Sequence, residues 1–198
     1  MVVGIVNYGV AGNIYSIKKA VEKAGGKTLI ISHPNHFNLV DKIILPGVGS
    51  FKDAMNELTN NGFIELLRNS NKPILGICLG MQILAKLGFE YGETQGLDLV
   101  DAEVRLIQCE GKVPHMGFNK LQLINCNPLL EGLRGEEFYF MHSYEMCNCI
   151  DIAALTEYEK HNFVSVICKG SVYGVQFHPE KSREAGIRLL SNFIKLKV

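Results

Sequence analysis

The chain has 198 residues, of which 47% are hydrophobic and 20% charged, and its formal net charge at pH 7 is zero. This length can bury the core of one good-sized domain, and the balanced charge, with neither a basic stripe nor an acidic tail, argues against nucleic acid as the main partner. No stretch approaches the roughly 18 apolar residues of a membrane helix, and the N-terminal apolar run lacks the basic leader of a signal peptide. We therefore expect one domain over residues 1–198, in the cytoplasm and away from membranes.

The first half of the chain alternates strand-like and helix-like segments. Short apolar runs predict strands at residues 2–7, 27–32, 42–47 and 73–78. Apolar residues at helical spacing predict helices at residues 13–25, about 52–59, 62–69 and 79–88. Strands that alternate with helices are typical of a parallel sheet whose faces are covered by helices.

The second half contains mainly β-type runs separated by turns. They lie at residues 102–107, 119–124, 136–141, 163–168 and 171–177. The last segment, 182–197, has helical periodicity, with Ser182 as the expected N-cap. We predict an α/β fold: an open, mostly parallel, twisted sheet that is flanked by helices and completed by mixed or antiparallel strands.

One cysteine stands at the turn between a predicted strand and a predicted helix. Cys78 lies in "GICLG", where the missing side chains of Gly76 and Gly80 let the chain turn tightly and leave space beside the sulfur. This pattern is the cysteine counterpart of the G-x-S-x-G nucleophile turn. The helix N-terminus favours the thiolate, and the amide of Leu79 can point at an oxyanion formed on a substrate carbonyl. Taken alone, the stretch is equally compatible with a buried cysteine in a glycine-rich turn.

A catalytic thiol needs a base, and six histidines are available. His178 is favoured because "SVYGVQFHPEKS" predicts a strand that ends there, and strand ends in an α/β sheet face the ligand crevice. Pro179 stops the strand, and Glu180 can return to the imidazole and hold its orientation. Among the other histidines, two could shape a pocket, namely His115 and His142. The remaining three are expected in solvent: His33, His36 and His161.

The six cysteines are an even number, but nothing marks the chain for secretion, so we expect no disulfide framework. Cys147 and Cys149 form a C-x-C pair that lacks the second pair of ligands a tetrahedral metal site needs. We therefore expect neither a metal nor a cofactor, and most of these cysteines should behave as small buried hydrophobes.

Three motifs occur in a fixed order: "PGVGSF" at 46–51, "GICLGMQ" at 76–82 and "GVQFHPEKS" at 174–182. Together they resemble the class I, triad-type glutamine amidotransferases, and the resemblance covers nearly the whole chain. The stretches "NYGVAGNIYSI", "VPHMGFNKL" and "FYFMHSYE" narrow it to the glutaminase subunits of imidazole glycerol phosphate synthase, from histidine biosynthesis. The resemblance implies a single amidotransferase domain with a flavodoxin-like fold.

The resemblance also implies a role for each matching residue. The triad maps onto Cys78, which forms a γ-glutamyl thioester, His178, which protonates the departing ammonia, and Glu180; water then releases glutamate. The expected oxyanion and substrate-binding residues are Gly47, Val48, Gly49, Leu79, Gln82, His142, Ser143 and Tyr144. Among these, the glycines on both sides of Val48 let its peptide unit rotate toward the oxyanion, and Gln82 holds the head group of glutamine.

The resemblance further implies a heterodimer in which ammonia passes to a separate (β/α)8-barrel cyclase subunit. The expected interface residues are Tyr8, Asn13, Phe118 and Asn119. Three departures leave the ammonia acceptor open. Phe118 stands where the family usually has tryptophan, Asn7 replaces a usual aspartate, and the loop at 8–13 is one residue longer than usual.

These departures admit an alternative with the same chemistry. It is a related subunit that supplies ammonia for amidating a surface-polysaccharide sugar nucleotide. Two other classes are also considered: a non-catalytic module on the same fold, and a cysteine peptidase on a related fold. The intact set of Cys78, His178 and Glu180 argues against the first, and Gln82 together with the 46–49 loop argues against the second.

Overall fold

The computed structural model of the protein describes residues 1–9 and 13–197. Its main sheet has eight strands, in the order β2-β1-β3-β4-β14-β13-β12-β9. The first five run parallel and are β2 (Lys27–Ile31), β1 (Val2–Val6), β3 (Lys42–Leu45), β4 (Ile74–Ile77) and β14 (Val172–Val175). Antiparallel pairing then adds β13 (His161–Lys169), β12 (Ile152–Tyr158) and β9 (Gln122–Leu123). The order of the parallel strands is that of flavodoxin-like folds, so the predicted fold class is confirmed.

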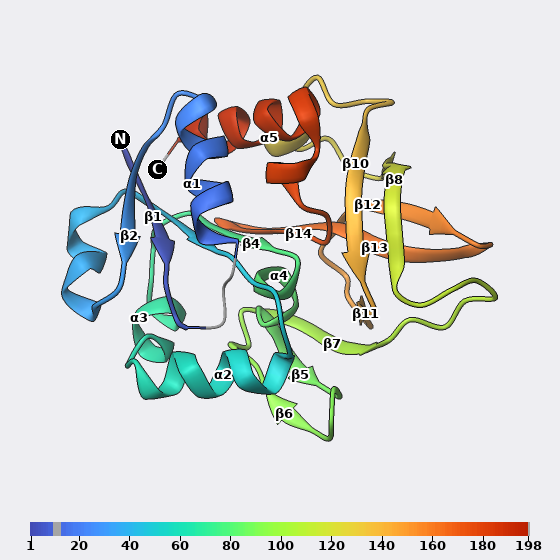
Figure 1. The fold of residues 1–198 in the computed structure, drawn as a ribbon, viewed down its shortest axis with the longest axis horizontal. Helices are drawn as coiled ribbons and strands as arrows, with labels where there is room; N and C mark the ends of the chain where they lie inside the picture. The colour runs from blue at the N-terminus through green and yellow to red at the C-terminus, as the bar shows by residue number, and fades with distance from the viewer. Residues whose placement is uncertain (10–12, 198) are drawn as a thin grey trace.

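Helices cover both faces of this sheet (Figure 1). The helices α1 (Ile14–Lys23) and α5 (Arg183–Lys195) pack against each other on one face, and α2 (Phe51–Asn60) and α3 (Ile64–Arg68) lie on the other. Each long helix turns an apolar stripe toward the sheet, as Ile17 and Val21 do in α1. Short 3-10 turns complete the connections: η1 (Pro34–Leu39), η2 (Pro128–Leu130) and η3 (Pro179–Lys181).

Two smaller sheets extend the molecule beyond the antiparallel strands. In one, β10 (Glu137–His142) pairs antiparallel with β8 (His115–Lys120), and Figure 1 shows this pair beside β12 and β13. The other sheet has the order β11 (Tyr144–Cys147), β7 (Val100–Leu106), β5 (Ala85–Gly88) and β6 (Thr94–Gln95). Together with β9, β13 and β14 of the main sheet, these strands account for the β-type runs expected in the second half of the sequence.

One predicted helix is mostly wrong. The helix expected at residues 79–88 is only α4 (Leu79–Gln82), and residues 85–88 form β5 instead. This strand pairs in parallel with β7 and antiparallel with β6. Hydrogen bonding to segments that follow it in the sequence therefore overrides the local helical spacing of its apolar residues.

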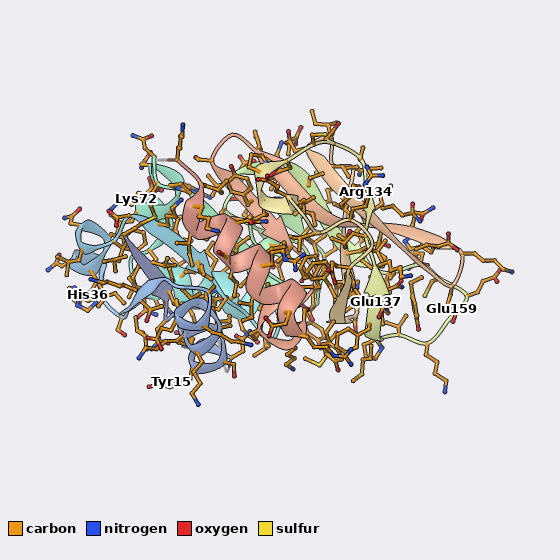
Figure 2. All side chains as sticks on the ribbon, turned by 90° about the horizontal axis from the view of Figure 1, so that it is seen from above. Tyr15, His36, Lys72, Arg134, Glu137 and Glu159 are labelled. Carbon is orange, nitrogen blue, oxygen red and sulfur yellow. The ribbon has the colours of Figure 1, made fainter. Side chains whose placement is uncertain are left out.

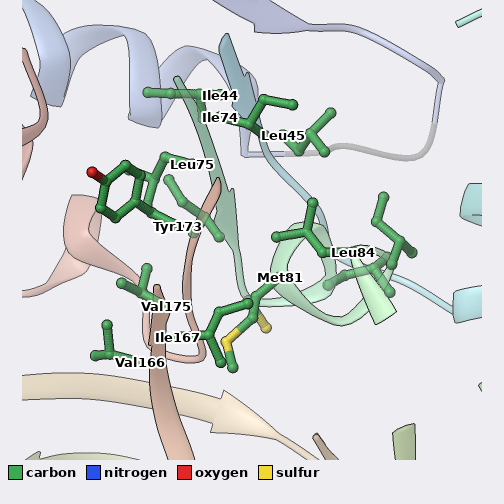
Figure 3. Packing of buried hydrophobic residues seen from close by; sticks show 14 of the residues in the cluster. Ile44, Leu45, Ile74, Leu75, Met81, Leu84, Val166, Ile167, Tyr173 and Val175 are labelled. Atoms are coloured by element: carbon green, nitrogen blue, oxygen red, sulfur yellow. The ribbon is translucent and has the colours of Figure 1, made fainter. Parts of the chain in front are cut away.

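The core beside α4 fixes the ends of two central strands (Figure 3). Met81 packs against β14 so closely that a Cβ on Gly174 would lie 2.7 Å from the Met81 Cγ atom. In the parallel ladder between β4 and β14, Ile77 lies opposite Val175. The chain therefore leaves both strands at the same edge of the sheet, where ligands bind in open α/β folds.

Most polar side chains lie on the outside of this core. Figure 2 shows Tyr15 on the outer side of α1 and Glu159 at the tip of the β12–β13 hairpin. Lys42 is an exception, because its buried ammonium group donates to the carbonyl of Leu196. No helix among the described residues is long and apolar enough to cross a membrane.

His161, which was expected in solvent, is half-buried. Its Nε2 atom lies 2.8 Å and 2.9 Å from the two carboxylate oxygens of the buried Glu145. The polar sequence around His161 gives no sign of this pairing, because Glu145 comes from the distant strand β11.

Candidate active site

The turn after β4 holds Cys78 in an unusual backbone conformation. Its φ and ψ are 53° and −109°, a combination that costs energy for any residue with a side chain. The amide of Cys78 donates to the carbonyl of Val175 at 2.8 Å, and its carbonyl accepts from the amide of Met81 at 3.0 Å. The amide of Cys78 is thus bonded to β14 and its carbonyl to α4, and these two hydrogen bonds hold the strained turn.

The glycines around Cys78 make room for backbone. A Cβ on Gly80 would lie 1.9 Å from the carbonyl oxygen of Leu45, and one on Gly76 would lie 2.4 Å from the carbonyl oxygen of Gly80. Gly76 and Gly80 were expected to leave space beside the sulfur. In the structure, the space where their side chains would be is occupied by neighbouring backbone. The two glycines let α4 lie directly against the end of β3, where the Pro46–Gly49 loop begins.

A cavity of about 440 Å³ opens at this turn, within the roughly 300–1,000 Å³ range of small-molecule sites. The structure places nine of the expected site residues on its wall: Val48, Gly49, Cys78, Leu79, Gln82, His142, Ser143, Tyr144 and His178. Gly47 and Glu180, also expected at the site, lie behind this wall. Residues from four separated parts of the chain therefore meet around one cavity.

His178 and Glu180 form a buried pair. The Nδ1 atom of His178 lies 2.9 Å from Oε1 of Glu180, and both side chains are fully buried. Burial lowers the pKa of His178, but the side chains of Cys78 and Glu180 more than offset this effect and raise it to about 10. Burial raises the pKa of Glu180, but hydrogen bonds from His178 and Asn13 outweigh it and hold that pKa below its ordinary value. The Nε2 atom of His178, on the other side of the ring, is buried and has no hydrogen-bond partner among the described residues.

The sulfur of Cys78 has one neighbour that the sequence interpretation missed. The Nε2 atom of Gln176 lies 3.7 Å from it, and the side chain of Gln176 is fully buried. Gln176 also accepts a hydrogen bond of 3.1 Å from the amide of Gln82, which donates a second one of 2.9 Å to the carbonyl of Tyr144. A signal existed, because Gln176 lies two residues before His178 and two-residue spacing in an extended chain places side chains on the same side.

Glu90 is a second missed residue. Among the described residues on the cavity wall it is the only carboxylate. Its Oε2 atom accepts a 2.7 Å hydrogen bond from the amide of Phe51, the first residue of α2. Burial raises the pKa of Glu90. No local motif marks this glutamate, since it reaches the cavity only through the folding of the connection after β5.

The loop between β3 and α2 is held on both sides. The phenol of Tyr8 donates to the carbonyl of Pro46. A Cβ on Gly47 would lie 2.7 Å from the Cβ of Leu79 and 2.8 Å from the Tyr8 oxygen. Gly49 has a φ of 114°, which favours glycine. Val48 and Gly49 therefore reach the cavity from a loop that has little freedom at Gly47.

Comparison with known proteins identifies the family. The sequence model described as Glutamine amidotransferase class-I matches residues 5–196. The chain belongs to the class I glutamine amidotransferases.

Several curated relatives of this amidotransferase carry one name. The imidazole glycerol phosphate synthase subunit HisH 1 of Campylobacter jejuni subsp. jejuni serotype O:23/36 (strain 81-176) is 43% identical over 194 residues, which is 94% of this chain and 96% of the relative. Subunit HisH of Vibrio cholerae serotype O1 is 44% identical over 199 residues, with 97% of each chain covered. Subunit HisH of Bacillus licheniformis is 42% identical over 201 residues, covering 96% of this chain and 94% of the relative.

Solved structures show the same fold at lower identity. A crystal structure of a glutamine amidotransferase superposes with a TM-score of 0.78 at 20% identity and covers 98% of each chain. The structure of PurLQS from Thermotoga maritima superposes with a TM-score of 0.74 at 17% identity, covering 98% of this chain and 97% of that one. At these identities the likeness concerns the fold alone.

Two histidines of this amidotransferase form a neutral pair, with His142 on the cavity wall and His115 behind it. The Nδ1 atom of His142 lies 2.9 Å from the carbonyl of Tyr144, which can only accept, so this nitrogen carries the proton. The Nε2 atom of His142 then accepts from Nδ1 of His115 at 3.2 Å. Burial lowers the pKa of His142 to about 3 and that of His115 to about 4. The His142 ring therefore lines the cavity, the His115 ring supports it without reaching the cavity, and neither is placed to act as a base.

The four expected interface residues of this amidotransferase divide into two groups. Tyr8 is fully buried and Asn13 is 8% exposed, so the structure removes both side chains from the surface where a partner was expected to contact them. Phe118 is 38% exposed, with the guanidinium of Arg183 4.3 Å from its ring centre, and Asn119 is exposed as well. The middle of the lengthened loop, residues 10–12, lies outside the described residues.

The terminal helix α5 of this amidotransferase begins after Ser182, which is its expected N-cap residue, but the Ser182 side chain does not bond to the helix. Its hydroxyl instead donates to the carbonyl of His178 at 2.6 Å and accepts from the amide of Tyr139 at 2.9 Å. Ser182 therefore braces the turn that carries His178 and Glu180 against β10.

Proposed function

We propose that this chain is the glutaminase subunit of an imidazole glycerol phosphate synthase, and that it hydrolyses L-glutamine to glutamate and ammonia. The observation that carries the chemistry is the meeting of Cys78 and His178 at one cavity, with the imidazole held from behind by Glu180. The relatives named as HisH, at 42–44% identity over nearly the full chain, support the pathway.

The first half of the proposed reaction forms a thioester. The Cys78 thiolate attacks the side-chain carbonyl carbon of glutamine, and a carbon–sulfur bond forms as the oxygen becomes an oxyanion. The amides of Leu79 and of the Val48–Gly49 segment are the donors proposed for that oxygen. The His178 imidazolium gives its proton to the leaving nitrogen from Nε2, and the carbon–nitrogen bond breaks to release ammonia. A His178 pKa of about 10 suits this step, because an imidazolium at neutral pH has a proton to give to the leaving nitrogen.

The second half restores the enzyme. His178, now neutral, takes a proton from water at Nε2 as the water oxygen attacks the thioester carbon. The carbon–sulfur bond then breaks, and glutamate leaves with the new oxygen. The sulfur is left as a thiolate and His178 as an imidazolium, as at the start. Glu180 holds the Nδ1 side of the ring and stabilises its charge in both halves.

Three further groups are proposed to recognise glutamine. The Glu90 carboxylate can pair with the α-ammonium group, and it is the only described acidic group on the cavity wall. Both hydrogens of the Gln82 amide are directed at Tyr144 and Gln176, so its oxygen is the atom left to accept from the substrate. The backbone of residues 142–144 forms the opposite wall.

The ammonia is proposed to pass to a cyclase subunit with a (β/α)8 barrel, in a heterodimer located in the cytoplasm. The relatives' printed name supports an acceptor in histidine biosynthesis. Co-purification tests this proposal directly: the cyclase should be the protein that accompanies this chain. Recovery of an enzyme that modifies a sugar nucleotide would favour the alternative acceptor.

The experiment for the chemistry is Cys78→Ala in the assembled complex. The glutamine-dependent synthase reaction should fall by orders of magnitude, because the nucleophile and its base act as a unit. The same reaction supplied with ammonium salt at alkaline pH should continue. The exposed Cys126, away from the cavity, gives the control variant Cys126→Ala, which should keep both reactions. A Cys78→Ala complex that keeps a tenth of the glutamine-dependent rate would contradict the thioester mechanism.

A further inference from the structure

Tyr8 and Asn13 lie five residues apart, at the two ends of one short segment between β1 and α1. Both are buried, yet neither lines the cavity. The Tyr8 hydroxyl and the Asn13 carboxamide each bond to a different part of the site. The proposed chemistry assigns a role to neither residue. Packing alone does not account for them, because each buried donor is aimed at one defined acceptor.

Tyr8 holds the loop that brings Val48 and Gly49 to the cavity. Its hydroxyl donates to the carbonyl of Pro46, an oxygen of the Pro46–Gly47 peptide unit. Burial, together with the charge of nearby Cys78, raises the pKa of Tyr8 far above its ordinary value, so the phenol keeps its proton and remains a donor. On the other side, Gly47 is pressed against Leu79 of α4. The orientation of this peptide unit is therefore fixed between Tyr8 and the residue that follows the nucleophile.

Asn13 holds the carboxylate behind the imidazole. Its Nδ2 atom donates at 2.8 Å to Oε1 of Glu180, the same oxygen that lies 2.9 Å from His178. Asn13 occupies the N-cap position of α1, but its side chain makes no capping bond there. Although asparagine is a favoured N-cap residue, the carboxamide of Asn13 bonds to Glu180 and not to the backbone of its own helix.

We propose that Tyr8 and Asn13 are positioning residues: Tyr8 holds the oxyanion loop through Pro46, and Asn13 holds the triad carboxylate of Glu180. The inference rests on the proposed glutaminase function. It adds that each half of the site is held by its own buried side chain outside the cavity wall.

The test of Tyr8 uses Tyr8→Phe in the complex with the co-purified partner. This change removes one hydroxyl and keeps the ring, so the fold should persist. The kcat for glutamine hydrolysis should fall roughly tenfold or more, with little change in KM, because the loop loses its orientation and not its contact with the substrate. Alkylation of Cys78 by iodoacetamide, which needs no oxyanion donor, should keep its rate. The matched control is Tyr15→Phe on the outer side of α1, where the ring is 72% exposed.

The test of Asn13 uses two variants of similar size. Asn13→Leu fills the space without a donor, and Asn13→Asp keeps the shape but, when ionised, presents only acceptors to Glu180. Both should lower kcat at least tenfold, an effect in the range of lost positioning, and Asn13→Leu should move the alkaline limit of activity to lower pH. That shift is expected because a loosely held Glu180 raises the pKa of His178 less. Asn125→Asp is the control, because Asn125 is exposed and does not line the cavity.

The outcomes separate this inference from the proposed function. The ammonium-dependent reaction of each variant, together with thermal unfolding, reports whether the complex has assembled. A wild-type complex that does not hydrolyse glutamine overturns the proposed function itself. An active wild type whose Tyr8→Phe and Asn13→Asp variants stay within twofold of its rate overturns the positioning roles.

Discussion

The sulfur of Cys78 differs from the other thiols in what surrounds it. Burial raises the pKa of Cys149 and Cys168, and burial together with Glu145 raises that of Cys147 to about 11. We expect a glutamine-like electrophile to label Cys78 first, because it alone faces a cavity that also holds His178. Peptide mapping after brief treatment measures this, and excess glutamine should protect Cys78. Preferential labelling of Cys147 or Cys149 would point to a different reactive site.

Glu180 sets the protonation of its partner. Its carboxylate, with Cys78, raises the pKa of His178 to about 10. In Glu180→Gln the charge is gone, so the pKa of His178 falls and its imidazolium is lost at a lower pH. We expect kcat to fall roughly 10²–10⁴-fold and the alkaline limit of glutamine hydrolysis to move to lower pH. The pH profile of glutamate release measures both effects.

A nearby carboxylate provides the control for that experiment. Glu184 lies one turn further along the chain, is exposed and pairs with Lys23 at 2.6 Å. Glu184→Gln should leave the profile unchanged. An unshifted alkaline limit in Glu180→Gln would show that His178 does not carry the titrating proton.

At the scale of single elements, α4 depends on a glycine for its position. A side chain on Gly80 would meet the carbonyl of Leu45 at 1.9 Å, and backbone cannot move aside as a flexible side chain can. Gly80→Ala should therefore displace α4 from β3, lower stability by roughly 1–3 kcal/mol and abolish most glutaminase activity. Gly170→Ala is the control for backbone strain alone: its positive φ disfavours alanine, but it has open space around it and lies outside the cavity wall, so its glutaminase activity should persist. Thermal unfolding with a glutaminase assay checks this. A Gly80→Ala variant that keeps the stability and activity of the wild type would mean that the contact is readily relieved.

The elements also show what the sequence could and could not predict. The strand–helix alternation and the strand ends at Cys78 and His178 are local patterns, and the parallel sheet confirms the fold class they indicate. The misread helix at 85–88 and the misread surroundings of His161 both depend on partners far away in the sequence. Glu90 reaches the cavity through such a long-range arrangement too, so no motif names it. Gln176 differs, because its two-residue spacing from His178 was a local signal.

At the scale of the whole molecule, two buried, neutral histidines make the free energy of unfolding depend on pH in the acidic range. The pKa of His115 falls from 6.5 to about 4 in the folded protein, and that of His142 to about 3, because both are buried. Below pH 6.5 the unfolded chain binds protons that the folded chain does not, so the free energy of unfolding decreases as the pH falls toward 4. The decrease from His115 alone should be on the order of 3 kcal/mol.

Denaturant unfolding at a series of pH values measures this slope. The variant His115→Phe keeps an aromatic ring against Tyr158 and Phe140 and cannot be protonated. Its free energy of unfolding should decrease less steeply between pH 6.5 and 4 than that of the wild type. Equal slopes would place the acid sensitivity elsewhere in the protein.

The φ of 53° at Cys78 belongs to the turn that presents the nucleophile, and it also lowers the stability of the folded protein. In most places alanine makes a protein more stable than glycine does, by roughly 0.5–1 kcal/mol. At position 78 the order should invert, because alanine keeps the strain of the turn and glycine releases it. Cys78→Gly should therefore unfold at a higher temperature than Cys78→Ala, although both lack the nucleophile. Random mutation followed by selection for heat resistance alone would then tend to discard this cysteine, and only selection for glutamine use retains it.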